Sequence, residues 1–135
     1  MNPQSCKAKG RRLQQWMRDR LLQIGASIGL QPGDVESRAM GQNGCDVYFS
    51  PRAGWNLPFA IECKNQQSLN VFSTFAKHAE KYKNAVAHDP TNYALVKPLI
   101  PLLVHSKNRN QPMVTMYVDD FLSIWNKLLT TNNQG

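Results

Sequence analysis

Residues 59–64 read Phe-Ala-Ile-Glu-Cys-Lys, and apolar and charged side chains alternate along the second half of this run. Side chains two positions apart in a β-strand point to the same face of the sheet. A strand here therefore projects Glu62 and Lys64 together, while Ile61 and Cys63 turn into the core. This pattern predicts both a strand and which of its two faces is charged.

A second short apolar run follows another carboxylate. Residues 45–49 read Cys-Asp-Val-Tyr-Phe, so a neighbouring strand can carry Asp46 to the same sheet edge. Two carboxylates and an ammonium at one edge are unfavourable as structure alone, because the carboxylates repel each other and lysine is seldom buried without a partner. A hard divalent cation resolves this conflict. The alternative is an ordinary surface ion-pair network of Asp46, Glu62 and Lys64.

Length and charge narrow the class of protein. The 135 residues suffice for one core, which predicts a single domain over residues 1–135 with flexible tails at 1–6 and 130–135. The net charge of +7 favours polyanionic partners such as nucleic acid. No apolar run approaches the roughly 18 residues of a membrane span, and the N-terminus lacks a signal-peptide stretch, so we expect a cytoplasmic protein without membrane contact. The three cysteines lack disulfide-scaffold or zinc-site spacing.

Hydrophobic periodicity predicts the order of the elements. We expect strands at residues 34–38, 45–49, 59–64, 102–105 and 113–118, and helices at residues 7–28, 71–87 and from 119 onward. Residues 50–58 read as a hairpin-like connection, and the prolines in residues 89–101 discourage a central strand. The side chains expected to be buried on the last two helices are Phe72, Phe75, Ala76, Ala79, Tyr82, Val86, Phe121, Leu122, Trp125 and Leu128. The result is an α/β fold with a mixed central sheet of about five strands flanked by helices.

The clustered charges suit one kind of chemistry. Hydrolysis of a phosphodiester needs charge neutralisation, an activated water and a stabilised leaving oxygen, and one or two Mg²⁺ ions can supply all three. Mg²⁺ prefers oxygen ligands and retains several waters, so Asp46, Glu62 and the backbone carbonyl of Cys63 are candidate ligands. Lys64 would orient the attacking water or compensate negative charge. Gln66 is a candidate contact to water or phosphate.

At these residues the chain resembles the PD-(D/E)XK nuclease superfamily, whose hallmark is an acidic residue on one strand and an E-x-K or D-x-K on the next. The pattern here is Gly44-Cys45-Asp46-Val47 followed by Ile61-Glu62-Cys63-Lys64. The resemblance is clearest over residues 7–86. It implies a restriction-endonuclease-like fold and a Mg²⁺-dependent endodeoxyribonuclease, for which Mn²⁺ is expected to substitute.

Within the superfamily, the chain is most similar to small phage-type Holliday-junction resolvase-like endonucleases. Those often carry a further Glu on the first helix, where this chain has Gln14 and Gln15. Glu36 is the candidate replacement ligand, and a surface role for it is the alternative. Exonuclease-like members have Gln-x-x-x-Tyr on the helix after the E-x-K strand. This chain has His78 and Tyr82 at that spacing, so this part of the resemblance is partial.

Candidate contacts to DNA lie near the first helix. The basic residues Lys7, Arg11 and Arg18 lie on the polar side of this helix, where a solvated face without DNA contact is the alternative. Ser37 resembles a serine that some resolvases place near the site, and Arg38 follows it. A different footprint on Lys77, Lys81, Lys107 and Arg109 is the remaining possibility.

The resemblance implies a metal-dependent endonuclease that cuts branched DNA. A chain this short leaves little room for reading base sequence, so it would recognise shape and phosphates. Two symmetric nicks need two sites, so we expect a twofold homodimer, with apolar residues of 93–100 as interface or as part of the core. The alternatives are a general or nicking nuclease on duplex or single-stranded DNA, and an inactive DNA-binding module of the same fold.

Overall fold

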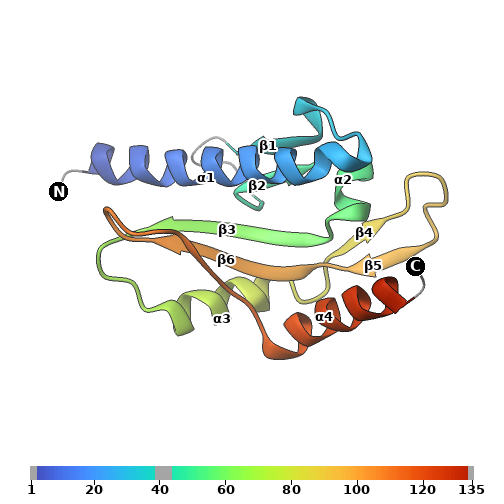
Figure 1. Ribbon diagram of the computed structural model, residues 1–135. Helices are drawn as coiled ribbons and strands as arrows, with labels where there is room; N and C mark the ends of the chain where they lie inside the picture. The colour runs from blue at the N-terminus through green and yellow to red at the C-terminus, as the bar shows by residue number, and fades with distance from the viewer. Residues whose placement is uncertain (1–2, 39–43, 134–135) are drawn as a thin grey trace.

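Helices and strands alternate along the chain in the computed structural model, which describes residues 3–38 and 44–133 (Figure 1). In order they are α1 (Pro3–Gly25), the 3-10 helices η1 (Ala26–Ile28) and η2 (Pro32–Asp34), β1 (Val35–Ser37), β2 (Val47–Phe49), α2 (Pro51–Asn56), β3 (Phe59–Asn65), α3 (Val71–Lys81), β4 (Val86–His88), β5 (Val96–Pro98), β6 (Ile100–Ser106), β7 (Met113–Thr115) and α4 (Val118–Asn133). The α/β class expected from the periodicity is confirmed.

The long strands β3 and β6 form the centre of a mixed sheet. They pair in parallel, and β7 adds to the other edge of β6 in the antiparallel direction. The antiparallel pair β1 and β2 forms a separate two-stranded sheet beside β3, to which it is joined by the hydrogen bond from the Asp46 N–H to the Ile61 carbonyl at 3.0 Å. The central mixed sheet therefore has three strands in the order β3-β6-β7, fewer than the five expected, although the restriction-endonuclease-like α/β architecture is confirmed.

Helices cover both faces of this sheet, with α1 on one side and α3 and α4 on the other (Figure 1). The core on the α1 side contains Leu13, Leu21, Leu30, Val35, Val47, Ala53, Ile61, Cys63, Leu102 and Val104. On the opposite face, Phe75 and Ala79 of α3 pack against Leu103 of β6. Glu62 is the register partner of Leu103, so its side chain lies on the α3 face of the sheet.

The connection between β2 and β3 contains a short helix, and the expected hairpin-like connection over residues 50–58 is wrong. The Ser50 hydroxyl caps α2 by accepting a hydrogen bond from the Ala53 N–H at 3.2 Å. Pro51 occupies the first helical turn, where its missing N–H is not needed. This local cap is enough to turn the segment into a helix.

Helix α3 ends at Lys81, six residues before its predicted end. The predicted helix ran into residues 86–88, which instead pair with residues 96–98 as the antiparallel hairpin of β4 and β5. The turn between these strands is held by Asp89, whose carboxylate accepts hydrogen bonds from the N–H and hydroxyl of Thr91, both at 2.8 Å. Phe72 is 86% exposed, so its expected burial is also wrong.

Pro101 lies inside the central strand β6, where prolines were expected to discourage strand formation. On the β3 side, the Ile100 N–H donates to the Pro58 carbonyl at 2.8 Å. On the other side, β7 pairs with residues 103–105 and does not extend to Pro101. No ladder donor is therefore needed at Pro101, which is why the strand tolerates it.

The apolar side chains of α4 are exposed, and their expected burial is wrong. Phe121, Leu122, Trp125 and Leu128 are between 49% and 58% exposed. The helix is joined to the core at its start, where Tyr117 contacts Phe75 edge to face with ring centroids 4.9 Å apart. An amphipathic pattern predicts an apolar face but not which surface covers it.

The two ends of the chain are helical where they are described. Helix α1 begins at Pro3 and α4 ends at Asn133, within the segments expected as flexible tails. Within residues 3–38 and 44–133, no helix combines the length and the apolar character needed to cross a membrane.

Candidate active site

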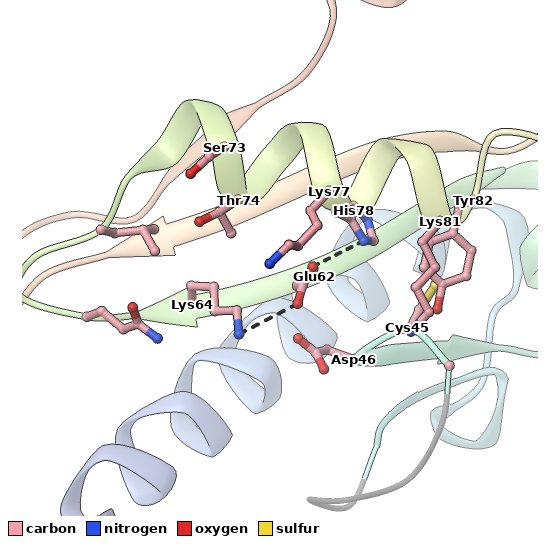
Figure 2. A pocket seen from close by; sticks show the side chains of 13 residues that line it. Cys45, Asp46, Glu62, Lys64, Ser73, Thr74, Lys77, His78, Lys81 and Tyr82 are labelled. Carbon is pink, nitrogen blue, oxygen red and sulfur yellow. Dashed lines mark ion pairs between the residues drawn. The ribbon is translucent and has the colours of Figure 1, made fainter.

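A cavity of about 410 Å³ lies between β3 and α3 (Figure 2). Its lining residues are Gly44, Cys45, Asp46, Glu62, Lys64, Gln66, Leu69, Ser73, Thr74, Lys77, His78, Lys81 and Tyr82. The cavity brings together Asp46, Glu62, Lys64 and Gln66, the four residues for which the sequence predicts a catalytic role. It also contains Ser73, Thr74 and His78 of α3, to which the sequence pattern assigns no catalytic or binding role.

Strand β3 supplies the paired charges of the cavity. Ile61 is fully buried and Cys63 is 5% exposed, both in the core under α1. The alternation of a strand turns Glu62 and Lys64 the other way, toward α3. The Lys64 Nζ atom lies 3.7 Å from Glu62 Oε1. This contact keeps one ammonium beside the carboxylate without occupying both of its oxygens.

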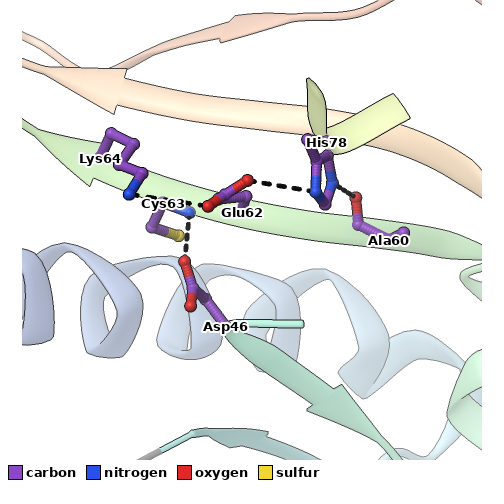
Figure 3. Close-up of polar contacts among 6 residues, drawn as sticks. All are labelled: Asp46, Ala60, Glu62, Cys63, Lys64 and His78. Atoms are coloured by element: carbon purple, nitrogen blue, oxygen red, sulfur yellow. Dashed lines mark hydrogen bonds and ion pairs between the residues drawn. The ribbon is translucent and has the colours of Figure 1, made fainter. Parts of the chain in front are cut away.

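Asp46 is held against β3 by backbone hydrogen bonds. Its carboxylate Oδ2 accepts a hydrogen bond from the Cys63 N–H at 2.7 Å (Figure 3). The Asp46 N–H also donates to the Ile61 carbonyl. Burial raises the pKa of Asp46, the Cys63 N–H lowers it, and the nearby Glu62 carboxylate raises it. The net direction is upward, so the site disfavours the charged form of Asp46 unless a cation is present.

His78 is a site residue for which the sequence pattern predicts no catalytic or binding role. It lies on α3, is 4% exposed, and its Nδ1 is 3.2 Å from Glu62 Oε2 (Figure 3). Its Nε2 lies 2.8 Å from the Ala60 carbonyl. A carbonyl can only accept, so Nε2 carries a proton and donates it there. A hydrogen bond from Nδ1 to Glu62 is the main cause of the lowered pKa of Glu62. It requires a proton on Nδ1 as well as on Nε2, so His78 makes this bond as an imidazolium.

Helical spacing alone places His78 away from the apolar side of α3, together with Lys77 and Lys81. The structure buries His78 and leaves both lysines exposed. The spacing of His78 and Tyr82 was the one signal in the sequence, and it was interpreted only as a partial resemblance. Burial of His78 depends on the tertiary packing of α3 against β3, which helical spacing does not specify.

The far end of the cavity is formed by Cys45 and Tyr82. Burial raises the pKa of the Cys45 thiol and of the Tyr82 phenol, so both are neutral at physiological pH. Lys81 lies over the Tyr82 ring, with Nζ 5.4 Å from the ring centroid. This end of the cavity therefore combines neutral groups with one exposed ammonium.

The donor set suits a hard divalent cation that keeps several waters. No three His, Cys, Asp or Glu side chains converge on a metal position in the described part of the chain. Asp46 and Glu62 supply two carboxylates, and the Cys63 N–H points to Asp46. The N–H and C=O of one strand residue point to the same edge, so the Cys63 carbonyl faces that side as well. Mg²⁺ needs no more than such a partial oxygen shell from a protein.

Glu36, Ser37 and Arg38 line a different cavity. It has a volume of about 380 Å³, and Tyr48 completes its lining. The Arg38 guanidinium lies over the Tyr48 ring at 4.8 Å from its centroid. Glu36 pairs in register with Tyr48, so these two side chains share a face of the β1–β2 pair. The structure therefore does not bring Glu36 into the cavity of Asp46 and Glu62.

The basic residues expected to contact DNA lie on α1, which covers the face of the sheet opposite α3. Lys7 and Arg11 are exposed, whereas Arg18 forms an ion pair with Asp19 at 2.9 Å. Gln14, where related nucleases often carry a glutamate, is 5% exposed, and its Oε1 has no hydrogen-bond partner among the described residues. Gln14 is not part of the cavity lining.

An aspartate before one strand, a Glu-x-Lys on the next and a mixed sheet with helices on both faces define the PD-(D/E)XK class of nucleases. The chain belongs to that class: residues 8–134 match the family described as "Phage putative PDDEXK endonuclease". The comparisons found no matching curated protein and no matching solved structure. The family confirms the expected superfamily and fold and implies nuclease activity on DNA; nucleases of this class generally use divalent metals.

Proposed function

We propose that the protein is a Mg²⁺-dependent endonuclease that cuts branched DNA, with a Holliday junction as its substrate. The observation that carries the proposal is the meeting of Asp46, Glu62 and Lys64 in one cavity between β3 and α3. Its place of action would be the cytoplasm of a phage-infected cell. Mn²⁺ is expected to replace Mg²⁺, since both accept oxygen ligands.

Each residue of the cavity has a separate task in this reaction. A bound Mg²⁺ would neutralise the scissile phosphate and lower the pKa of a water. Asp46 and Glu62 provide the carboxylates that hold it, and the backbone at Cys63 fixes Asp46. The Lys64 ammonium compensates charge that develops on the phosphate. Gln66 lines the same cavity and is placed to contact water or phosphate.

A branched substrate is favoured over a specific linear sequence. The described residues form the central sheet, the β1–β2 pair, the β4–β5 hairpin and the helices around them, and among these elements none stands apart as a unit for reading bases. Recognition through phosphates and shape fits such a chain better than readout of base edges. A junction has two symmetry-related strands to cut, which calls for two copies of the site.

The surface of α4 supports the homodimer. Its apolar residues Phe121, Leu122, Ile124, Trp125, Leu128 and Leu129 are between 37% and 58% exposed. Tyr117 and Val118, which are 52% and 70% exposed, extend this apolar face, and a contiguous exposed apolar face of this kind marks a surface for protein association. We propose that a second copy of this chain covers the apolar face of α4. Leu95 and Val96 in the region first expected to form the interface are each 51% exposed and add a smaller patch.

A cleavage panel tests the proposal. The protein is incubated with Mg²⁺ and a mobile four-way junction, a duplex of the same arm sequence, and each single strand. Paired symmetric nicks in the junction support the resolvase function. Equal cleavage of the linear DNAs would favour the general or nicking nuclease, and binding without cleavage in Mg²⁺ or Mn²⁺ would favour the inactive DNA-binding module.

A further inference from the structure

One side of α3 presents a row of polar groups to the cavity (Figure 2). Ser73, Thr74, Lys77 and Lys81 all line it, and none of them has a task in the proposed reaction. From Ser73 to Lys81 the helix rises about 12 Å at 1.5 Å per residue. That length corresponds to roughly three to four nucleotides at about 3.4 Å each. The row is therefore long enough to contact several consecutive phosphates.

The charges of this row are available for a ligand. Across residues 3–38 and 44–133, neither Lys77 nor Lys81 forms an ion pair with a carboxylate. Lys83, two residues beyond Lys81, is instead paired with Glu80 at 2.7 Å. The two cavity-facing ammoniums thus differ from their neighbour, because neither lies within ion-pair distance of a carboxylate among the described residues, and an anion that enters the cavity would meet both.

The cavity continues past the start of α3, at Val71. A second cavity of about 570 Å³ shares Gln66 and Leu69 with the first. It is also lined by Lys107 and Asn110, which belong to the turn between β6 and β7. The two cavities together form a path from Lys81, past the carboxylates, to Lys107, with a positive charge at each end.

We propose that this path holds the sugar-phosphate backbone of the strand that is cut. The inference rests on the proposed nuclease function and names the wall that binds its substrate. Lys77 and Lys81 contact phosphates on one side of the scissile bond, and the hydroxyls of Ser73 and Thr74 donate to phosphate oxygens nearby. The basic residues of α1 lie across the sheet, so they cannot contact the same stretch of backbone.

The test measures binding, not cleavage. Fluorescence anisotropy with a labelled single strand and its duplex, in Ca²⁺ and over a range of salt, gives the slope of log affinity against log salt. K77Q/K81Q should make this slope shallower by up to roughly 1.4 on the single strand and 1.8 on the duplex, from about 0.7 and 0.9 per phosphate contact. K77R/K81R keeps the charges and should retain the wild-type slope.

The control is K83Q/K127Q, which lowers the net charge by the same two units. Lys83 is paired and Lys127 is on α4, so the control should leave the slope unchanged. Equal slopes for both double-glutamine variants would overturn the inference, as would a wild-type slope in K77Q/K81Q. If the wild type still cleaves DNA in Mg²⁺, such a result rejects only the proposal that α3 binds the backbone of the cut strand. A wild type that neither binds nor cleaves DNA removes the nuclease function as well.

Discussion

The carboxylate of Asp46 accepts a hydrogen bond from the backbone N–H of Cys63 at 2.7 Å. Cys63 lies between Glu62 and Lys64, so this bond ties the first acidic residue to the backbone of the strand that carries the other two charges. Fixed backbone positions hold reacting groups more precisely than long side chains do. The cavity is therefore arranged before any metal or DNA is present.

The three charged residues should be essential for cleavage and dispensable for folding. D46N, E62Q and K64A are each expected to lower the cleavage rate by at least roughly 100-fold, the usual cost of losing one group that stabilises developing charge. Junction binding in Ca²⁺ should persist. Single-turnover cleavage in Mg²⁺ and circular dichroism are the measurements. Near wild-type turnover in any one variant would remove that residue from the site.

D46N should also stabilise the metal-free protein. The pKa of Asp46 is raised chiefly by burial, so its charged form destabilises the fold as pH rises above the ordinary value of 3.8. Asparagine removes the charge and keeps an oxygen for the Cys63 N–H. We expect D46N to melt a few degrees above the wild type at pH 7 in EDTA, and the difference to vanish at the acidic end of the series. Calorimetry from pH 3 to pH 8 measures this.

E62Q is the matched control, because the pKa of Glu62 is shifted in the opposite direction. The His78 hydrogen bond lowers it, so the charge on Glu62 stabilises the fold above its ordinary pKa of 4.5 and loses this effect as pH falls through the folded-state pKa. E62Q should therefore melt below the wild type at pH 7. A lower melting temperature for both variants would contradict the opposite roles of the two carboxylates.

Calcium should support DNA binding with little hydrolysis. Its larger and more flexible coordination shell positions an attacking water less well than Mg²⁺ does. The expected result is a junction affinity in Ca²⁺ similar to that of the Mg²⁺ complex, with cleavage reduced at least roughly 100-fold. Gel-shift and cleavage assays on the same DNA compare the two ions. Rapid cleavage in Ca²⁺ would argue against the proposed ligand set.

The dimer should depend on the apolar face of α4. Light scattering at micromolar concentration is expected to give roughly twice the 15.3 kDa chain mass, as in a twofold homo-oligomer. L122E/L129E should give the monomer mass. S123E/T130E places the same charges on the polar side of the helix and should remain dimeric. A wild-type monomer that also stays single on junction DNA would contradict both the dimer and the resolvase function.

Neutralising α1 should affect only large substrates. K7Q/R11Q/R18Q changes the face of the sheet opposite the cavity, which a junction arm or duplex can reach but a single strand in the groove does not. The salt dependence of binding should become shallower on the junction, by up to about 0.9 for each phosphate that α1 no longer neutralises, and stay constant on a single strand. If the salt dependence of binding is unchanged on every DNA, the basic residues of α1 form a solvated surface that does not contact DNA.

The alternation of residues 59–64 was sufficient to predict the strand and its charged face. Those features depend on periods of two and on residue type, which a sequence shows directly. The helix over residues 51–56 could also have been predicted, because Ser50 followed by Pro51 is a helix-start signal. The prediction of a hairpin-like connection did not use this signal. The place of His78 in the site could not be predicted from the sequence, because its burial and its contact with Glu62 arise only when α3 packs on the sheet.

The last helix shows a different limit. The stripe of Phe121, Trp125 and Leu128 indicated an apolar face correctly, and the error was to assume that the same chain covers it. A single sequence indicates that one face of a helix is apolar. It does not indicate whether the same chain or another copy packs against that face. The proline of β6 shows the same limit, since Pro101 is acceptable only because β7 is short.

Both walls of the cavity come from consecutive elements, β3 and α3, joined by residues 66–70. Asp46 is the main polar group that arrives from elsewhere, and the Cys63 backbone holds it. The distance between Glu62 and Lys77 is therefore set by one short connection and is insulated from changes in the edge strands and in α4. The proposed association through α4 and the proposed binding of DNA in the groove therefore rest on separate elements, so that substitutions on α4 can change the assembly of the chain and leave the groove intact.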